Sequence, residues 1–272
     1  MPRLGVDLVA PVRTVNAQGK SPFVLVCDHA SNRIPPAYAN LGLSAADRLR
    51  HVAWDPGALA VSLRLTELLD APLLHATASR LVIDCNRHLD SPTAIAELSE
   101  ITAIPGNIGI SAADRAERTA RYHAPFHEAI DRLLAQRQAA GRDSILVCMH
   151  SFTPVYLGVK RPWPIGILPP PGERFSAALF EALAGELPGM ALGWNQPYAG
   201  GKGVSYTVDR HGEGRDATMI EIRHDEILEP NGVALWADRL ARCLEAARVA
   251  LHGASAHLSS PLRGGIALEG RD

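Results

Sequence analysis

The stretch Pro22–His29, PFVLVCDH, is a run of apolar residues that ends in an aspartate and a histidine. Two other runs have the same character: SILVCMHS places His150 at its end, and ATMIEIRHD carries Glu221. Continuous apolar runs of this length are typical of strands buried on both faces, as in parallel α/β sheets. Because such sheets hold their chemistry at the carboxyl ends of the strands, these three side chains are predicted to meet in one crevice.

Segments with helical spacing alternate with the apolar runs. Helices are predicted after Asp55-Pro56-Gly57, from Ser111 to about Arg142, in RFSAALFEALAGEL and in GVALWADRLARCLEAARVAL. Further strands are predicted in APLLHAT, RLVIDCN, IGILPPP and MALGWN, and a long glycine-rich loop in YAGGKGVSYTVDRHGEGRD. The alternation indicates an α/β fold with a single three-layer domain, in which helices cover both faces of a central mixed, mostly parallel sheet. The domain is predicted over 21–252, between an N-terminal extension (1–20) and a flexible tail (253–272).

The composition is that of a globular protein, with 47% hydrophobic and 21% charged residues and a formal net charge of −2. The near-neutral net charge argues against a nucleic-acid partner. The sequence contains no apolar span of 18 residues, so a membrane partner is not indicated. The glycines form neither of the fingerprints that cradle nucleotide phosphates. The four cysteines lack paired spacings, which favours buried thiols and a reducing compartment, so we expect a cytoplasmic protein. Because nucleic-acid and membrane partners are disfavoured, the expected partner is a small molecule.

Two histidines at strand ends favour a metal centre. Zn²⁺ takes neutral imidazole nitrogens, and a catalytic site usually adds a third protein ligand and a water, so His29 and His150 are candidate ligands. Glu221 lies among apolar residues, and burial raises a carboxyl pKa toward the range where the group both accepts and donates protons. A structural ion pair between Glu221 and Arg223 or Arg87 is the alternative reading.

The segment Ser79–His88, SRLVIDCNRH, carries two arginines and an asparagine at a predicted strand end. Arginine forms bidentate pairs with carboxylates, so Arg80 and Arg87, beside Asn86, are candidates for binding an anionic substrate. The alternative is that both arginines pair with Asp84 or neighbouring acids.

The strings VCDHASNRIPP, WDPGA, SRLVIDCNR, RYHAPFH, MHSF and IEIRHDE, taken in this order, resemble the N-formylglutamate amidohydrolase family, within the zinc carboxypeptidase-like hydrolases. The resemblance covers roughly residues 20 to 250. It implies a carboxypeptidase-like three-layer fold, one Zn²⁺ and hydrolysis of an N-acyl amide on an amino acid, such as N-formylglutamate, to formate and the amino acid. It also implies that His29 and His150 bind the metal, and that Glu221 is the general base.

The resemblance also assigns substrate-binding residues. The pair Asn86 and Arg87 would engage the substrate carboxylate, Arg80 would stabilise the oxyanion, and Arg223 or Arg210 would reach a side-chain carboxylate.

One position departs from the pattern of the wider group. Where that group has a glutamate ligand in H-x-x-E, this chain has Asn32, a poorer zinc ligand. The third ligand is therefore Asn32, Asp28, Asp55 or a water. The segment RYHAPFH additionally places His127 as a candidate for the lining of the site.

Two functions from other classes stay open. One is a cofactor-free serine hydrolase that uses Ser151 or Ser205 with a histidine, although there is no GxSxG motif to support it. The other is a non-catalytic ligand-binding protein that has kept the scaffold and lost the metal.

Overall fold

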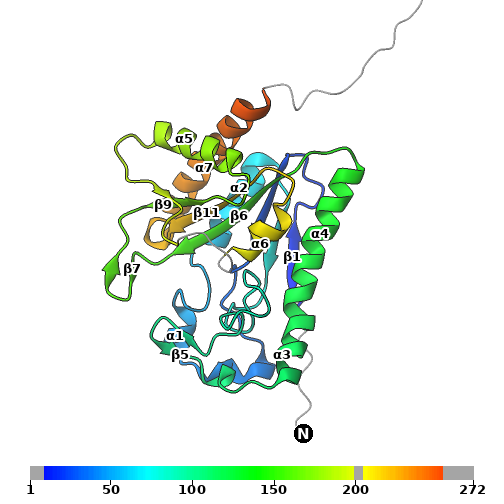
Figure 1. Cartoon of the computed structure of the whole chain (residues 1–272). Helices are drawn as coiled ribbons and strands as arrows, with labels where there is room; N and C mark the ends of the chain where they lie inside the picture. Colours follow the sequence, from blue (N-terminus) through cyan, green and yellow to red (C-terminus); the bar gives the residue numbers. More distant parts are fainter. Residues whose placement is uncertain (1–8, 199–204, 254–272) are drawn as a thin grey trace, which may run out of the picture.

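The computed structural model describes residues 9–198 and 205–253, and these contain one seven-stranded sheet (Figure 1). Its strands are, in spatial order, β1 (Val12–Val15), β3 (Leu73–Ala76), β2 (Phe23–Cys27), β6 (Ile145–Phe152), β11 (Ala217–Arg223), β9 (Ile165–Leu168) and β10 (Gly193–Trp194). The four strands β3, β2, β6 and β11 are parallel to one another, whereas β1 runs antiparallel to β3 and β9 runs antiparallel to β11. The predicted mixed, mostly parallel sheet is confirmed.

Helices cover both faces of this sheet. One face packs against α2 (Ala58–Leu69), α5 (Arg174–Glu186) and α7 (Pro230–His252), and the other against α4 (Ala124–Ala139) and α6 (Tyr206–His211). In Figure 1, α4 stands along one side of the sheet while α5 and α7 lie on the other.

The side chains of β2 show why its sequence is apolar throughout. Phe23 and Leu25 pack into the first helical layer, and Val24 and Val26 pack into the second. Successive side chains of a strand point to opposite faces, so a strand that is covered twice needs no polar position.

The segments that follow β2 and β3 form a third cluster below the carboxyl ends of the strands, and a hairpin follows β6. The elements of these segments are η1 (Pro36–Gly42), α1 (Ala45–Leu49), β4 (Leu98–Ser99), β5 (Thr102–Ala103), η2 (Pro105–Asn107) and α3 (Ala112–Arg118). The hairpin after β6 is made of β7 (Val155–Tyr156) and β8 (Val159–Lys160), and η4 (His224–Glu226) follows β11.

The segment RLVIDCN is not a strand, contrary to the sequence-based prediction. Its backbone closes local turns, with Val82 N donating to Ser79 O at 2.9 Å and Arg87 N to Asp84 O at 3.2 Å. Leu81 and Val82 pack into the lower cluster instead of the sheet. The apolar pattern was correct about burial and wrong about backbone conformation, because periodicity alone does not separate a short strand from a buried turn.

The helix predicted from Ser111 to about Arg142 is interrupted. Ser111 caps α3 as expected, accepting a hydrogen bond from Asp114 N at 3.0 Å, and Gly141 follows the end of α4 with φ +66°. Between α3 and α4 lies a π-helical turn, Thr119–His123, directly before Pro125 in the first turn of α4. Proline has no N–H to continue an α-helical ladder, which explains the change at this point.

The predicted glycine-rich loop contains a helix in its described part. α6 (Tyr206–His211) forms there, and Val208 anchors it in the second helical layer. Residues 199–204 of the predicted loop lie outside the described residues. A six-residue helix is too short to show a clear helical period in the sequence.

At the N-terminal end, β1 lies ahead of the predicted domain start and pairs with β3. Of the predicted tail, all but Gly253 lies outside the described residues. All four cysteines are buried. No helix among the described residues has the length and apolar character that crossing a bilayer requires.

Candidate functional site

A cleft of about 210 Å³ opens at the carboxyl ends of the parallel strands. His29 follows β2, while His150 and Glu221 lie within β6 and β11. Arg80 and Arg87 come from the turns after β3 and line the same cleft. The structure thus brings together side chains from four sequence segments, at the edge of the sheet where parallel strands place their functional residues.

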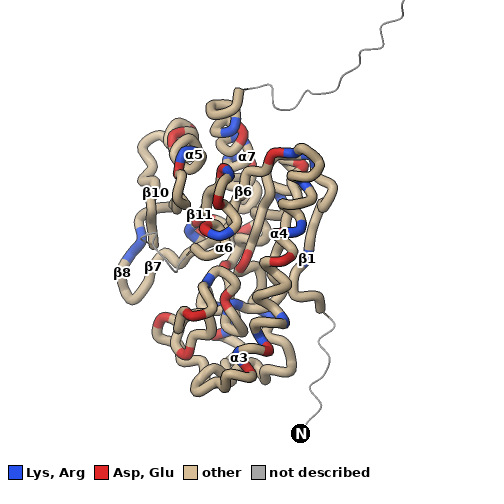
Figure 2. Tube along the Cα trace, turned by 45° about the vertical axis from the view of Figure 1, so that its right-hand side comes forward, with Lys and Arg blue, Asp and Glu red and all other residues tan. Residues whose placement is uncertain are grey.

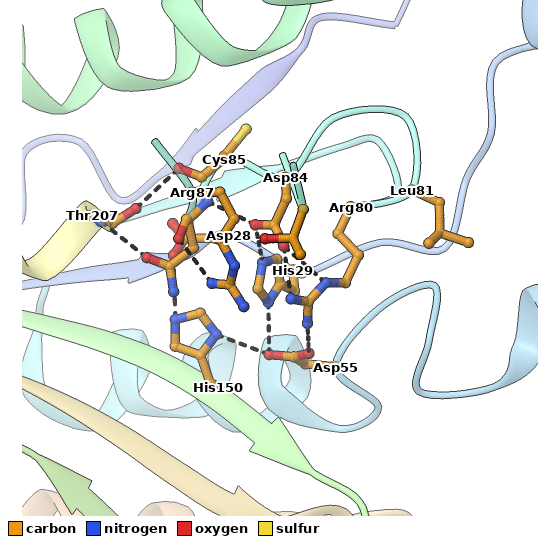
Figure 3. A network of polar contacts seen from close by, with 12 residues as sticks. Asp28, His29, Asp55, Arg80, Leu81, Asp84, Cys85, Arg87, His150 and Thr207 are labelled. Atoms are coloured by element: carbon orange, nitrogen blue, oxygen red, sulfur yellow. Dashed lines mark hydrogen bonds and ion pairs between the residues drawn. The ribbon is translucent and has the colours of Figure 1, made fainter. Parts of the chain in front are cut away.

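A His-Asp-His cluster lies at the base of the cleft (Figure 3). Asp55 Oδ2 lies 3.2 Å from His29 Nδ1 and 2.9 Å from His150 Nδ1, and all three side chains are buried. With metal–ligand distances near 2.0–2.1 Å, the ligand atoms of a tetrahedral zinc site lie about 3.3 Å apart. Both distances from Asp55 Oδ2 are close to that separation, and ligand atoms of the three residues all lie within 4.8 Å of one another.

The turn Asp55-Pro56-Gly57 sets the position of Asp55. Asp55 N donates to His29 O at 2.9 Å, which ties the start of α2 to the end of β2. Gly57 has φ +82°, and a Cβ atom there would lie 2.4 Å from Ile227 O. Only glycine combines this left-handed conformation with so close a backbone approach.

Each histidine of the cluster also faces a second carboxylate. His29 Nε2 lies 2.8 Å from Asp84 Oδ1, to which it donates a hydrogen bond when neutral. His150 Nε2 lies 3.2 Å from Asp28 Oδ2, although not in hydrogen-bond geometry. A carboxylate behind a histidine fixes the tautomer and the ring orientation, and leaves the other nitrogen lone pair for a metal.

The charge of the cluster also fits a divalent cation. Asp28, Asp55 and Asp84 are buried around the two imidazoles, and Arg80 contacts Asp55 and Asp84. With neutral imidazoles, this group carries a formal charge of −2. Buried charge must be compensated, and a divalent cation or protons on the histidines would do so.

The pKa shifts follow from the same contacts. Burial lowers the pKa of His150, but its contacts with Asp28 and Asp55 outweigh burial and hold that pKa well above its usual value. Burial raises the pKa of Asp55, but the charge of His29 and the hydrogen bond from His150 hold it below the usual range. The cluster therefore attracts positive charge.

Glu221 lies beside His150 because the two residues are register partners on parallel strands. Its side chain is buried, and Oε2 has no hydrogen-bond partner among the described residues. Burial, together with the charge of Asp55, raises the pKa of Glu221 to about 7. A carboxyl group with this pKa exchanges protons readily at neutral pH.

Arg80 forms hydrogen bonds and ion pairs with the carboxylates of Asp84 and Asp55. Its Nε and Nη2 donate to Asp84 Oδ2 at 3.1 and 2.7 Å, and Nη1 lies 3.5 Å from Asp55 Oδ1. The sequence-based alternative, in which Arg80 pairs with Asp84, is thus present in the structure. Arg80 lines the cleft and at the same time orients the carboxylate behind His29.

Two histidines hold the turn that carries Arg87. His127 Nε2 donates to Cys85 O at 2.9 Å, and His123 Nε2 donates to Arg87 O at 3.1 Å. His127 is buried and is not among the residues that line the cleft. Its contact is with the backbone of the turn, which it positions.

The side chain of Asn86 is held from the other direction. Its Oδ1 accepts a hydrogen bond from Thr207 N at 3.0 Å, and Asn86 is almost fully buried beside the cleft. The contact provides an acceptor for one of the backbone N–H groups in the first turn of α6.

Asn32 and Arg223 lie away from the cluster. Asn32 Nδ2 donates to Arg48 O at 3.0 Å, and Arg223 is paired with Asp225 and Glu226. Neither residue lines the cleft. The side chain of Arg223 is held by two acidic residues close to it in the sequence. The side chain of Asn32 is held by the backbone of a loop 16 positions away, a tertiary contact.

Sequence reasoning missed three contributors to the site. Asp84 was considered only as a partner of an arginine, Tyr198 lines the cleft near Glu221, and His211 lies 2.8 Å from His127 through Nε2 and Nδ1. Asp84 carries a usable signal, since it stands in the same segment as Arg80. Tyr198 and His211 carry none, because both lie in a stretch predicted as a loop.

The sequence matches the family model of N-formylglutamate amidohydrolase over residues 21–228, which is well over half of the chain. No curated protein sequence gives a significant match.

Two solved structures resemble this one over nearly their whole length. One is a gene product of Agrobacterium tumefaciens, with 39% sequence identity and a TM-score of 0.86, where the match covers 92% of this chain and 99% of that chain. The other is the N-formylglutamate amidohydrolase from Ralstonia eutropha, with 22% identity and a TM-score of 0.69, covering 90% of this chain and 100% of that chain. The second likeness shows a shared fold. By the extent of the family match, this chain belongs to the N-formylglutamate amidohydrolase family.

Proposed function

We propose that this protein is a zinc-dependent amidohydrolase that hydrolyses the amide bond of an N-acyl amino acid, with an N-formyl acidic amino acid such as N-formylglutamate as the first candidate. One observation carries the metal dependence: His29 and His150 each direct Nδ1 toward Asp55 and Nε2 toward a second carboxylate. Family membership supports the amidohydrolase class.

The metal would be held by His29 Nδ1, His150 Nδ1 and Asp55 Oδ2. Two imidazoles with one carboxylate form a donor set that suits zinc and leaves a position open for water or substrate. When bound, such an ion lowers the pKa of water and polarises a carbonyl group. In this proposal Asp55 takes the place that Asn32 would have as third ligand, so the departure at Asn32 does not weaken the site.

Glu221 would move the proton. At neutral pH a carboxyl group with a pKa of about 7 is partly ionised, so it takes a proton from the attacking water in one step. The protonated carboxyl then donates that proton to the nitrogen of the leaving amine. Glu221 is buried within β11, and its Oε2 has no hydrogen-bond partner in the described part of the chain, which keeps the group available for both steps.

Arg87 would bind the carboxylate of the amino-acid substrate. It lines the cleft, and the histidines behind it fix the backbone from which its guanidinium projects. Arg80 is held by Asp84 and Asp55, so its role is to orient these carboxylates and to add positive charge beside the reacting carbonyl.

The cleft suits a single acylated amino acid. Its volume of about 210 Å³ is small, and its lining mixes ionisable groups with apolar residues such as Phe152 and Tyr156. The family match suggests the formyl group and the acidic side chain of the substrate. A panel of substrates tests these two features separately from the hydrolysis of the amide bond.

The deciding experiment measures bound metal and turnover together. We expect one zinc per chain by elemental analysis, loss of activity on chelation, and recovery on zinc addition. Against a panel of N-formyl and N-acetyl amino acids, Glu221→Gln should lower kcat about 10²–10⁴-fold with little change in metal content. Glu181→Gln, an exposed glutamate on α5, is the matched control and should behave as wild type.

A chelator-resistant activity would contradict the metal mechanism and favour the serine hydrolase. The structure gives that alternative no support, because Ser151 Oγ donates to Pro56 O at 2.8 Å and Ser205 Oγ to Asp209 Oδ2 at 2.8 Å. Tight binding of an N-acyl amino acid with no turnover in the zinc-loaded protein would instead favour the non-catalytic scaffold.

A further inference from the structure

The Asp84–Arg87 turn is held from behind by side chains that take no part in the proposed proton transfers. Arg87 Nη1 donates to Asn86 O at 3.0 Å, so its guanidinium is tied to the backbone of its own turn. The carbonyl of Cys85 accepts a hydrogen bond from His127 Nε2 at 2.9 Å. A shift of this backbone would therefore move the guanidinium that lines the cleft.

The contacts continue from His127 to the surface of the protein. His127 Nδ1 lies 2.8 Å from His211 Nε2 on α6, and His211 Nδ1 lies 2.9 Å from Asp131 Oδ1 on α4. The two imidazoles are buried and their rings are stacked, with 18° between their planes, while the side chain of Asp131 is 50% exposed. His127, His211 and Asp131 thus form a continuous chain of polar contacts from the Cys85 carbonyl to solvent, here named the histidine chain.

Two neighbouring helices supply the histidine chain. His127 and Asp131 are four positions apart on α4, so both lie on the helix face that meets His211 of α6. Figure 2 shows α6 beside α4, with acidic and basic positions on both helices. Helix α6 also contacts the turn directly, through the hydrogen bond from Thr207 N to Asn86 Oδ1. The turn is therefore braced by α6, and α4 anchors that brace through Asp131.

The end groups of the histidine chain set the positions of its protons. The Cys85 carbonyl only accepts, so His127 Nε2 carries a proton, and the neutral ring accepts at Nδ1 from His211 Nε2. The contact between His211 Nδ1 and Asp131 needs a third proton, one more than two neutral imidazoles carry. Burial lowers the pKa of His211, and the charge of Asp131 opposes that shift and attracts the proton to this contact. Asp131 thereby orients His211, and His211 orients His127.

We propose that His211 and Asp131 are positioning residues for the substrate: acting through His127, they hold the turn at the place where Arg87 meets the carboxylate of the substrate. The inference rests on the proposed function, in which Arg87 binds that carboxylate. None of the three residues of the histidine chain lines the cleft. Their effect is therefore on the affinity for substrates that carry a carboxylate, and the zinc content of the protein does not depend on them.

The test changes the exposed end of the histidine chain in the full-length zinc-loaded protein. In Asp131→Ala, KM for a substrate with a free carboxylate should rise about 3–10-fold, the effect of one lost hydrogen bond, while KM for the corresponding amide stays unchanged. Asp131→Asn should restore the wild-type KM, because an amide N–H donates to neutral His211 without a third proton, and the amide oxygen still accepts from Arg210 Nη2, now 2.8 Å from Asp131 Oδ2. Glu128→Ala, which removes an exposed carboxylate from α4, is the matched control and should behave as wild type.

Hydrogen–deuterium exchange of the peptide that spans residues 81–90 tests the same contacts without turnover. Exchange should be faster in Asp131→Ala and as in wild type in Asp131→Asn and Glu128→Ala, because a turn that has lost its support opens more often. Unchanged exchange in Asp131→Ala would overturn the proposal. So would an equal rise in KM for the carboxylate and amide substrates, or a raised KM that Asp131→Asn does not restore. A wild-type protein without turnover would contradict the proposed function, and exchange would still decide whether the histidine chain holds the turn.

Discussion

Asp84→Asn gives the sharpest test of the metal centre. The change keeps the shape of the side chain and removes the charge that faces His29 Nε2 across 2.8 Å, between side chains only 3% and 4% exposed. Loss of a carboxylate behind a metal-binding histidine weakens metal binding about 10–100-fold, which corresponds to about 1.4–2.7 kcal/mol. We expect the lower end if the amide oxygen keeps accepting from Nε2, and the upper end if the ring turns.

The assay is zinc titration in a chelator-buffered series, with a fluorescent zinc indicator as the readout. Asp90→Asn is the matched control, because Asp90 is exposed in the same segment, and we expect it to bind zinc as the wild type does. Asn32→Ala should also leave the affinity unchanged, since Asn32 bonds to the backbone of Arg48. A zinc affinity for Asp84→Asn within about threefold of wild type, in a protein with an intact melting curve, would refute the reasoning.

Three further predictions concern the substrate, the loop geometry and acid stability. Arg87→Ala should lower kcat/KM about 10–100-fold for substrates with a free carboxylate and change little for the corresponding amides, as steady-state kinetics will show. Gly57→Ala should destabilise the fold by about 1–3 kcal/mol in urea unfolding and weaken zinc binding, because φ is +82° and the new Cβ would meet Ile227 O. Burial lowers the pKa of His127 to about 3, so its neutral form stabilises the fold above the unfolded-state pKa near 6.5, and this stability is lost as the pH falls toward 3. The loss should amount to about 2 kcal/mol between pH 6.5 and 5, and a stability curve for His127→Gln that is as steep as that of wild type over this range would contradict the assignment.

Several parts of the fold could be predicted from local sequence. The apolar runs around β2, β6 and β11 predict buried strands because alternate side chains enter two helical layers, and Ser111 and Gly141 mark a helix start and end through their capping chemistry. The segment RLVIDCN defeats the same reasoning. Its apolar residues are buried as expected, but in the lower cluster, where local turns satisfy the backbone.

The sequence by itself determined that His29, His150 and Glu221 lie at one edge of a parallel sheet, because strand direction places the carboxyl ends together. Only the tertiary structure decided which carboxylates meet the histidines. Asp55 and Asp84 reach His29 from 26 and 55 positions away in the chain, and Asn32, three positions away, turns to Arg48. Ligand geometry depends on distances of a few tenths of an ångström between segments, and those distances are set by how the layers pack.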